Sequence, residues 1–258
     1  LASLCHGRAP QPPILFQGGV AGNGGVARAL RELLGLKEGD LVRPEAHRVM
    51  GAWGAALIAR QHPLERPVSL AEVAAALPDR AEDEPPSGLA PLAAGGEEAE
   101  DRAPVLQGTG DADERGAVEG DAGGSCEGDG AGGSANQADD GEWFVGVDVG
   151  SVSTKAVAID AGGRLAATAY LPTAGRPVDA VRAAMDALRS QLPGDARVAR
   201  AVTTGSGRHL ARDLLDADEV VDEITAQARA ATHFTPDADT IFEIGGQDAK
   251  YVRLSGGR

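Results

Sequence analysis

Aromatic residues, cysteines and long apolar runs are all scarce in this 258-residue chain. Phe, Trp and Tyr make up 3% of it, so any core must be built mainly from Ala, Val and Leu. No apolar run approaches the ~20 residues that span a bilayer, so we expect no membrane segment. No charged amino-terminal stretch precedes an apolar one, so no secretory signal is expected. Two cysteines, Cys5 and Cys126, are too few for a disulfide framework, which favours a reducing cytoplasm.

An excess of basic residues is also missing. The chain has 24 Lys and Arg against 39 Asp and Glu, a net charge of −15. Proteins that bind nucleic acid usually present a basic face, so this balance argues against such a partner.

Most of the negative charge lies in residues 80–141. This segment has 16 acidic residues, 3 arginines and 14 glycines, and it lacks Phe, Tyr, Trp and Ile. Such a composition cannot bury enough apolar surface to offset the entropy of ordering, so we expect a disordered linker. An electrostatic interaction tail is the alternative interpretation.

The first of two expected ordered parts is residues 1–79. A short strand at 14–16 is predicted to enter a glycine-rich turn, followed by a helix that ends at Gly35. Gly18 and Gly19 lack Cβ atoms, so the main chain there can lie against a base or a ribose. Asn23 can then hydrogen-bond either the sugar or the start of the helix.

The same turn also fits the dinucleotide pattern G-x-G-x-x-A, with Asp40 as a ribose acid, although it is long for that motif. A second helix, at 47–61, is rich in small residues that would let it approach another backbone closely. Ser69 and Glu72 have the spacing of a capping box that opens a third helix.

The second ordered part is residues 142–258, and its first turn concentrates phosphate chemistry. Strands are predicted at 144–149 and 155–160. Asp148, near the end of the first strand, is placed to hold a Mg²⁺-bound water. The connecting turn offers close backbone approach, hydroxyl donors and one positive charge, from Gly150, Ser151, Ser153, Thr154 and Lys155.

A similar strand–turn–strand device follows at 240–254. Its strand 240–244 contains Glu243, and its turn contains Gly245, Gly246, Gln247 and Asp248 before Lys250. Each device carries an acid and a lysine, so two hairpins that face each other can clasp a triphosphate from both sides. Between them we expect a strand at 164–171, a helix at 177–192, a strand at 198–203 and a helix at 223–234.

In this order the motifs resemble the actin/Hsp70/sugar-kinase ATPase superfamily, which has a ribonuclease H-like α/β fold. Residues 203–208, 223–228 and 242–251 closely resemble the BadF/BadG/BcrA/BcrD-type ATPases, which activate 2-hydroxyacyl-CoA dehydratases and benzoyl-CoA reductases. Residues 16–23 are similar to the adenosine motif of that family, and residues 51–58 to its closing helix.

The resemblance implies that ATP binds between two lobes. Asp148 and Glu243, where many relatives have Asp, would organise Mg²⁺ and the attacking water. Adenosine would contact Gly18, Gly19 and Asn23. The phosphates would lie against the two turns, at Gly150, Ser151, Ser153, Thr154, Lys155, Gly245, Gly246, Gln247 and Asp248.

The resemblance also implies that hydrolysis drives a low-potential electron from a [4Fe-4S] cluster to a dehydratase or reductase component. In the family each subunit of a homodimer contributes two cysteines to the cluster. Cys5 and Cys126 do not lie in matching contexts, so no cluster ligands are expected in this chain. Glu223 belongs to a family motif, and we interpret it as a hinge or lobe contact.

The family motifs occur in an unexpected order, because the C-terminal ones come first. We interpret residues 1–79 as the C-terminal part of a first activator-type ATPase domain and residues 142–258 as the N-terminal part of a second. A permuted single domain whose halves dock is the alternative. If neither domain is whole, the isolated chain is expected to have little or no ATPase activity. A non-catalytic nucleotide-binding module and an NAD-dependent oxidoreductase are the competing functions.

Overall fold

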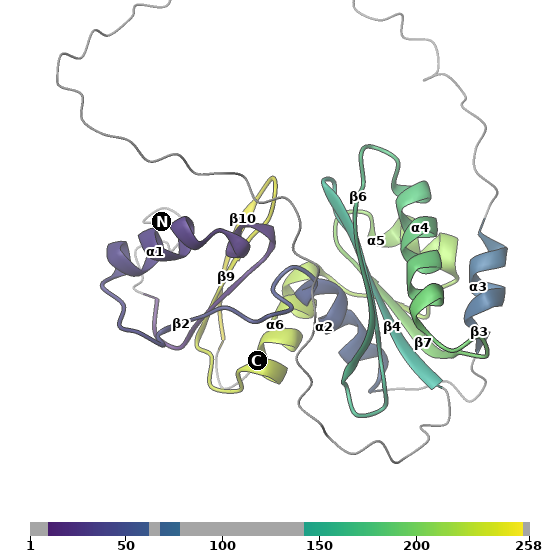
Figure 1. Ribbon diagram of the computed structural model, residues 1–258, viewed down its shortest axis with the longest axis horizontal. Helices are drawn as coiled ribbons and strands as arrows, with labels where there is room; N and C mark the ends of the chain where they lie inside the picture. The colour runs from purple at the N-terminus through teal and green to yellow at the C-terminus, as the bar shows by residue number, and fades with distance from the viewer. Residues whose placement is uncertain (1–9, 62–67, 78–141, 255–258) are drawn as a thin grey trace, which may run out of the picture. The chain divides into compact units, whose positions relative to one another are not determined.

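Two mixed sheets organise the structure. The computed structural model describes residues 10–61, 68–77 and 142–254, and in these residues the chain forms a four-stranded sheet and a six-stranded sheet. Helices pack on both faces of each sheet (Figure 1). The elements in chain order are β1 (Ile14–Gln17), η1 (Gly19–Gly22), α1 (Gly24–Leu34), β2 (Leu41–Val42), α2 (Met50–Ala59), β3 (Val68–Ser69), α3 (Leu70–Ala76), β4 (Glu142–Val149), β5 (Ser153–Ile159), β6 (Leu165–Pro172), α4 (Pro177–Gln191), β7 (Arg197–Thr204), α5 (Arg208–Leu215), β8 (Glu219–Val220), α6 (Glu223–Phe234), β9 (Thr240–Ile244) and β10 (Ala249–Arg253).

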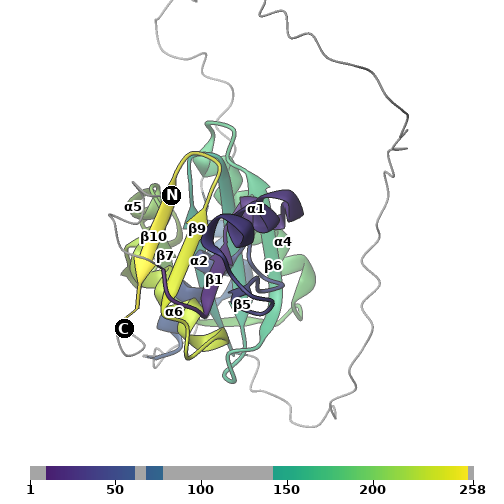
Figure 2. The same cartoon turned by 90° about the vertical axis from the view of Figure 1, so that its left-hand side faces the viewer.

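The smaller sheet joins the two ends of the chain. Its order is β10-β9-β1-β2, and β1 runs parallel to β9 from the pair Ile14↔Thr240 to the pair Gln17↔Glu243 (Figure 2). Side chains alternate between the faces of a strand. Phe16 and Phe242 therefore pack against α1 on one face, whereas Leu15 and Ile241 pack against α6 on the other.

The larger sheet has the order β3-β7-β4-β5-β6, with β8 added along β7. β4 and β5 form an antiparallel hairpin, and β6 continues it, in line with the strands predicted at 144–149, 155–160 and 164–171. Val145 and Val147 of β4 point into the core beneath α3, α4 and α5. The opposite face packs against α2, where Phe144 meets Ala52 and Ala56.

Helices α2 and α6 pack against each other between the sheets, at a spacing that only small residues permit. A Cβ on Gly54 of α2 would lie 1.8 Å from the carbonyl oxygen of Ala226 in α6. A Cβ on Gly146 of β4 would lie 1.9 Å from the carbonyl oxygen of Ala52 in α2. The expectation that the small-sided helix approaches another backbone closely is confirmed.

Both parts predicted to be ordered therefore contribute to one compact unit, to which all the described residues belong. Docked halves are compatible with this arrangement, and whether they come from one permuted domain or from two successive domains stays a prediction. The acidic segment 80–141 lies outside them. The capping box of Ser69 and Glu72 is confirmed. No helix in the described part of the chain combines the length and the apolar character needed to cross a bilayer.

The start of α6 depends on one capping side chain. Asp222 accepts hydrogen bonds from the backbone N–H of Thr225, at 2.9 Å, and from its hydroxyl, at 2.6 Å. We expect Asp222→Ala to lower the free energy of unfolding by about 1 kcal/mol at neutral pH, because an N-cap is lost. Asp222→Asn keeps an acceptor and is the matched control. Urea denaturation measures both.

The same contacts predict how this difference depends on pH. The hydrogen bonds from Thr225 hold the pKa of Asp222 below its ordinary value. The stabilisation is thus fully present above the pKa of an unfolded aspartate and is lost as the pH falls through the lowered one. The gap between wild type and Asp222→Ala should shrink as the pH falls below the ordinary pKa of an aspartate, about 3.9. A gap that widened in acid would contradict this assignment.

Candidate functional site

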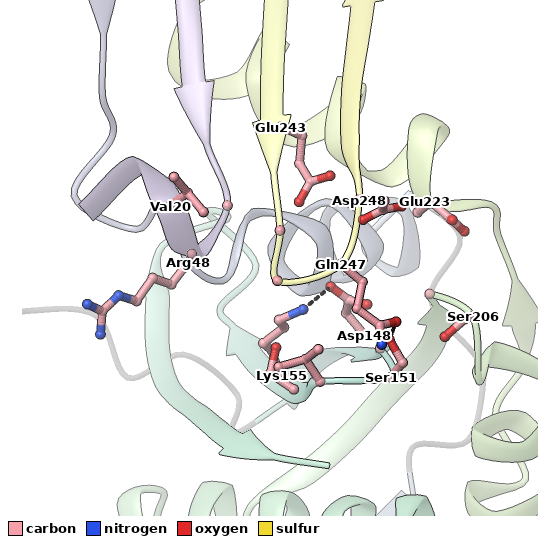
Figure 3. A pocket seen from close by; sticks show the side chains of 18 of the residues that line it. Val20, Arg48, Asp148, Ser151, Lys155, Ser206, Glu223, Glu243, Gln247 and Asp248 are labelled. Atoms are coloured by element: carbon pink, nitrogen blue, oxygen red, sulfur yellow. Dashed lines mark hydrogen bonds and ion pairs between the residues drawn. The ribbon is translucent and has the colours of Figure 1, made fainter. Parts of the chain in front are cut away.

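The residues predicted to bind phosphate meet in one cavity. It has a volume of about 730 Å³, within the range of about 300–1,000 Å³ typical of ligand pockets, and Figure 3 shows its interior. Its walls come from the β1–η1 junction, the segment before α2, both hairpin turns, the turn after β7, and α6. The predicted site residues that line it are Gly18, Gly19, Asp148, Gly150, Ser151, Ser153, Lys155, Glu243, Gly245, Gly246, Gln247 and Asp248.

The two hairpins repeat one arrangement of charge. In the β4–β5 hairpin Asp148 is the cross-strand partner of Lys155, and in the β9–β10 hairpin Glu243 is the partner of Lys250. The lysine Nζ lies 3.1 Å from Asp148 Oδ2 in the first pair and 3.4 Å from Glu243 Oε2 in the second. The two acid–lysine hairpins predicted from the sequence therefore both form an acid–lysine pair in the structure.

The two turns also touch each other. The hydroxyl of Ser151 donates a hydrogen bond to the side-chain oxygen of Gln247. A Cβ on Gly246 would lie 3.1 Å from a methyl carbon of Val152. This contact joins the hairpin turns of the two sheets beside the cavity.

The carboxylate of Asp148 is held between two glycines. Asp148 is buried, and a Cβ on Gly51 would lie 2.7 Å from its Oδ2. A Cβ on Gly205 would lie 2.4 Å from its Oδ1, and Gly205 has φ +88°. A side chain at either position would meet the carboxylate, so these two glycines leave the space that it occupies.

Glu243 is the second buried carboxylate of the cavity. Burial raises the pKa of its carboxyl group, because the charged form loses hydration, and nearby Asp248 adds to the effect while Lys250 opposes it. Lys250 also pairs with Asp248. A carboxyl group with a raised pKa is suited to accept a proton near neutral pH.

Two predicted site residues support the cavity from outside its lining. The hydroxyl of Thr154 lies 2.9 Å from that of Thr173, which in turn donates to the carbonyl of Gly150 at 2.7 Å. Asn23 caps α1, because its side-chain oxygen accepts the N–H of Gly25 at 2.9 Å. Of the two contacts expected of Asn23, the structure thus places it on the helix start.

Asp40, the ribose acid of the dinucleotide hypothesis, also lies outside the cavity lining. Its carboxylate accepts the backbone N–H of Lys37 at 2.8 Å. The glycine turn forms the short helix η1 before α1 instead of crossing directly from strand to helix. This geometry does not favour NAD.

His47 and Arg48 line the cavity without a clear sequence signal, and Gln227 lies in a family motif but was not predicted as a site residue. His47 lies between β2 and α2, and its Nδ1 is 2.9 Å from the carbonyl oxygen of Gly18. The guanidinium of Arg48 lies 5.9 Å from the ring centroid of Tyr170 at the cavity wall. Gln227 of α6 accepts a hydrogen bond from Gln17 of β1 at 2.6 Å, and both side chains are buried.

Whether the cavity suits a magnesium nucleotide depends on the charges of its side chains. Lys155 and Lys250 are both paired with carboxylates, so they are already largely neutralised before any phosphate arrives. No group of three or more His, Cys, Asp or Glu in the described ranges could hold a metal alone. Mg²⁺ is commonly held by one or two carboxylates, waters and the phosphates themselves. The donors present fit that mode of binding.

The [4Fe-4S] cluster implied by the resemblance finds no support in this structure. Such a cluster needs cysteine thiolates. Cys5 and Cys126 are the two cysteines of the sequence, and both lie outside the described residues. We derive no step through a cluster for this chain.

The second part of the chain is similar to known proteins. Residues 145–258 match the model of the BadF/BadG/BcrA/BcrD ATPase family, which confirms the resemblance for these residues and supports ATP binding. They contain both hairpin turns.

Curated relatives agree with this match. The chain is 34% identical over 112 residues to the activator of lactoyl-CoA dehydratase of Anaerotignum propionicum, covering 43% of this chain and 42% of that protein. It is 31% identical over 114 residues to the 2-hydroxyisocaproyl-CoA dehydratase activator of Clostridioides difficile, covering 43% and 41%. The chain thus spans about two-fifths of the length of these relatives.

A solved structure is also similar. Component A of the (R)-2-hydroxyglutaryl-CoA dehydratase of Acidaminococcus fermentans aligns at a TM-score of 0.38 and 24% identity, covering 45% of this chain and 44% of that one.

Proposed function

We propose that this unit binds ATP as its magnesium complex between the two hairpin turns and hydrolyses it, as part of an activator of a 2-hydroxyacyl-CoA dehydratase or related reductase. The observation that carries the proposal is the meeting of two acid–lysine hairpins in one cavity. The family match and the names of the relatives support the reaction class and the partner.

The cavity residues have three proposed roles: some bind the phosphates, some bind adenosine and some take part in hydrolysis. The backbone and hydroxyls of the two turns bind the phosphates, while Gly18 and Gly19 lie against adenosine. Asp148, a buried carboxylate that lines the cavity, would hold a metal-bound water. Glu243 accepts the proton of the attacking water, which fits its raised pKa. Lys250 is held in place by Asp248.

When bound, Mg²⁺ would neutralise charge on the β- and γ-phosphate oxygens. The protein's part is positioning, because phosphoryl transfer depends mainly on alignment and electrostatic stabilisation. Lys155 contributes only when its attraction to Asp148 is weakened. A divalent cation held near Asp148 would have that effect and would leave Lys155 available to pair with phosphate.

This charge balance makes nucleotide binding depend on metal. We expect chelation of Mg²⁺ to weaken ATP binding at least tenfold, because both cavity lysines are paired with carboxylates. Isothermal titration with MgATP, with ATP plus EDTA and with NAD measures this directly. NAD is the control ligand and should not bind. Binding of NAD without binding of MgATP would overturn the proposed function.

For the intact protein we propose activation of a dehydratase or reductase component. The resemblance implies that a [4Fe-4S] cluster shared in a homodimer would supply the low-potential electron, and no ligands for it are expected in this chain. We also retain the hypothesis that residues 1–79 and 142–258 come from successive domains of a tandem activator, joined by the acidic segment. The neighbouring coding sequence tests it. An upstream in-frame start of a first ATPase domain is expected, and its absence would favour a permuted single domain.

A further inference from the structure

The turn between β7 and α5 sets the position of Asp148. Gly205 lies so close to Asp148 Oδ1 that a Cβ there would approach it to 2.4 Å. The backbone N–H of Gly207 donates to the carbonyl of Val149 at 2.8 Å. Residues 205–207, the Gly205 turn, therefore rest directly on the end of β4. A movement of this turn would therefore change the space available to the carboxylate of Asp148.

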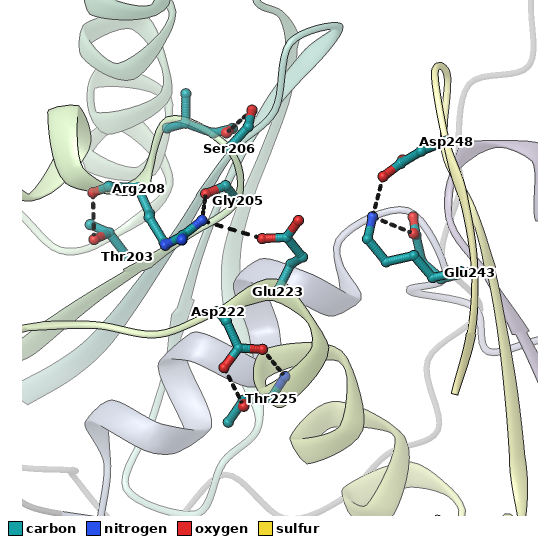
Figure 4. Close-up of polar contacts among 11 residues, drawn as sticks. Thr203, Gly205, Ser206, Arg208, Asp222, Glu223, Thr225, Glu243 and Asp248 are labelled. Atoms are coloured by element: carbon teal, nitrogen blue, oxygen red, sulfur yellow. Dashed lines mark hydrogen bonds and ion pairs between the residues drawn. The ribbon is translucent and has the colours of Figure 1, made fainter. Parts of the chain in front are cut away.

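The side chain of Arg208 holds the Gly205 turn, and Glu223 in turn pairs with Arg208. Nη1 of Arg208 donates to the carbonyl oxygen of Gly205 at 3.0 Å and lies 3.5 Å from Oε2 of Glu223 (Figure 4). The hydroxyl of Thr203 donates to the carbonyl of Arg208 at 2.9 Å. Glu223 is the first residue of α6, directly after the capping residue Asp222. The turn is thus tied to the capped end of a helix.

The rest of α6 connects this tie to the smaller sheet. Ala230 and Ala231 of α6 pack against Leu15 of β1 and Ile241 of β9. Glu223 itself lines the cavity. The Arg208–Glu223 pair is therefore the described ion pair that joins the Gly205 turn, in the larger sheet, to the helix on which the smaller sheet packs.

We propose that Arg208 and Glu223 are positioning residues, which hold the Gly205 turn against Asp148 and so set the orientation of that carboxylate toward a metal-bound phosphate. The inference rests on the proposed function and assigns Glu223 a role. Arg208 acts through the carbonyl of Gly205 and does not line the cavity.

The quantity to measure is the gain in ATP affinity that Mg²⁺ provides, which is the ratio of the dissociation constants without and with the metal. This ratio cancels effects on nucleotide binding in general and on the amount of folded protein. Both side chains are about one-third exposed, at 31% and 33%, so the pair is of modest strength. We expect Arg208→Gln and Glu223→Gln each to lower the ratio about fivefold.

The double variant separates coupled from independent roles. Because both residues act on one turn, Arg208→Gln/Glu223→Gln should lower the ratio no further than either single change. Arg212→Gln is the matched control, because Arg212 is an exposed residue of α5, the helix that begins at Arg208. This variant should leave the ratio unchanged. Measurable ATP binding without Mg²⁺ shows that each variant is folded.

Three results would overturn the inference. The single variants could keep the wild-type ratio, their effects could multiply in the double variant, or Arg212→Gln could lower the ratio equally. Failure of the proposed function looks different, because the wild-type protein would then bind no ATP under any condition.

Discussion

Gly146→Ala is expected to lower the free energy of unfolding by about 3 kcal/mol or more, because the new methyl group meets backbone that cannot move aside. The Cβ would lie 1.9 Å from the carbonyl oxygen of Ala52 and 2.5 Å from the amide nitrogen of Ala56. Both atoms belong to α2, so the helix must shift from the sheet. In a unit of this size the loss corresponds to a fall in melting temperature of roughly 6–12 °C.

Gly54→Ala tests the other side of α2. Alanine stabilises a helix interior by about 1 kcal/mol relative to glycine, so propensity alone predicts a gain. We expect a loss, because the Cβ would lie 1.8 Å from the carbonyl oxygen of Ala226. Gly24→Ala is the matched control: it also lies in a helix, and its Cβ would meet nothing within 4 Å. It should change stability by less than about 0.5 kcal/mol.

For Gly146→Ala, thermal unfolding and MgATP binding should be measured together. The cavity has walls from both parts of the chain. Gly146→Ala should therefore weaken nucleotide binding along with stability. A Gly146→Ala protein that melts within about 2 °C of wild type would show that α2 does not pack on β4 in solution.

These glycines also show what the sequence can predict. The strands of both hairpins follow from short runs rich in apolar residues, and their turns from glycine and polar residues, so the β4–β5 and β9–β10 hairpins were predictable. The pairing of β1 with β9 was not, because it joins Ile14 to Thr240 and no local pattern encodes a contact at that separation. The docking of the two parts could be stated only as an alternative for the same reason.

Helix α2 illustrates a second limit. Nine of its ten residues are buried, so it has no polar face to show how it is oriented. His47 and Arg48 lie just before it, in a segment expected to be helical, and their place in the cavity depends on how the chain enters α2. Conversely, Thr154 and Asn23 have the right chemistry for a binding site, but their hydrogen bonds are used to brace the backbone.

Asp148→Asn is expected to change nucleotide binding in opposite directions with and without Mg²⁺. The substitution keeps the size of the side chain and removes the charge that neutralises Lys155 at 3.1 Å. Without Mg²⁺ the freed lysine should bind the phosphates several-fold more tightly than in wild type. The increase in ATP affinity that Mg²⁺ gives the wild-type protein should largely disappear in the variant, because a carboxylate that helps to hold the metal is gone.

Phosphate release completes the test of Asp148. Little turnover is expected if neither domain is whole, but the cavity of this unit contains both turns together. We therefore expect metal-dependent phosphate release that falls at least a hundredfold in Asp148→Asn. Asp186→Asn, an exposed aspartate of α4 outside the cavity, is the control and should match wild type. Equal loss of ATP binding with and without Mg²⁺ in Asp148→Asn would mean that Asp148 merely shapes the fold. Turnover that survives the substitution would remove it from the reaction.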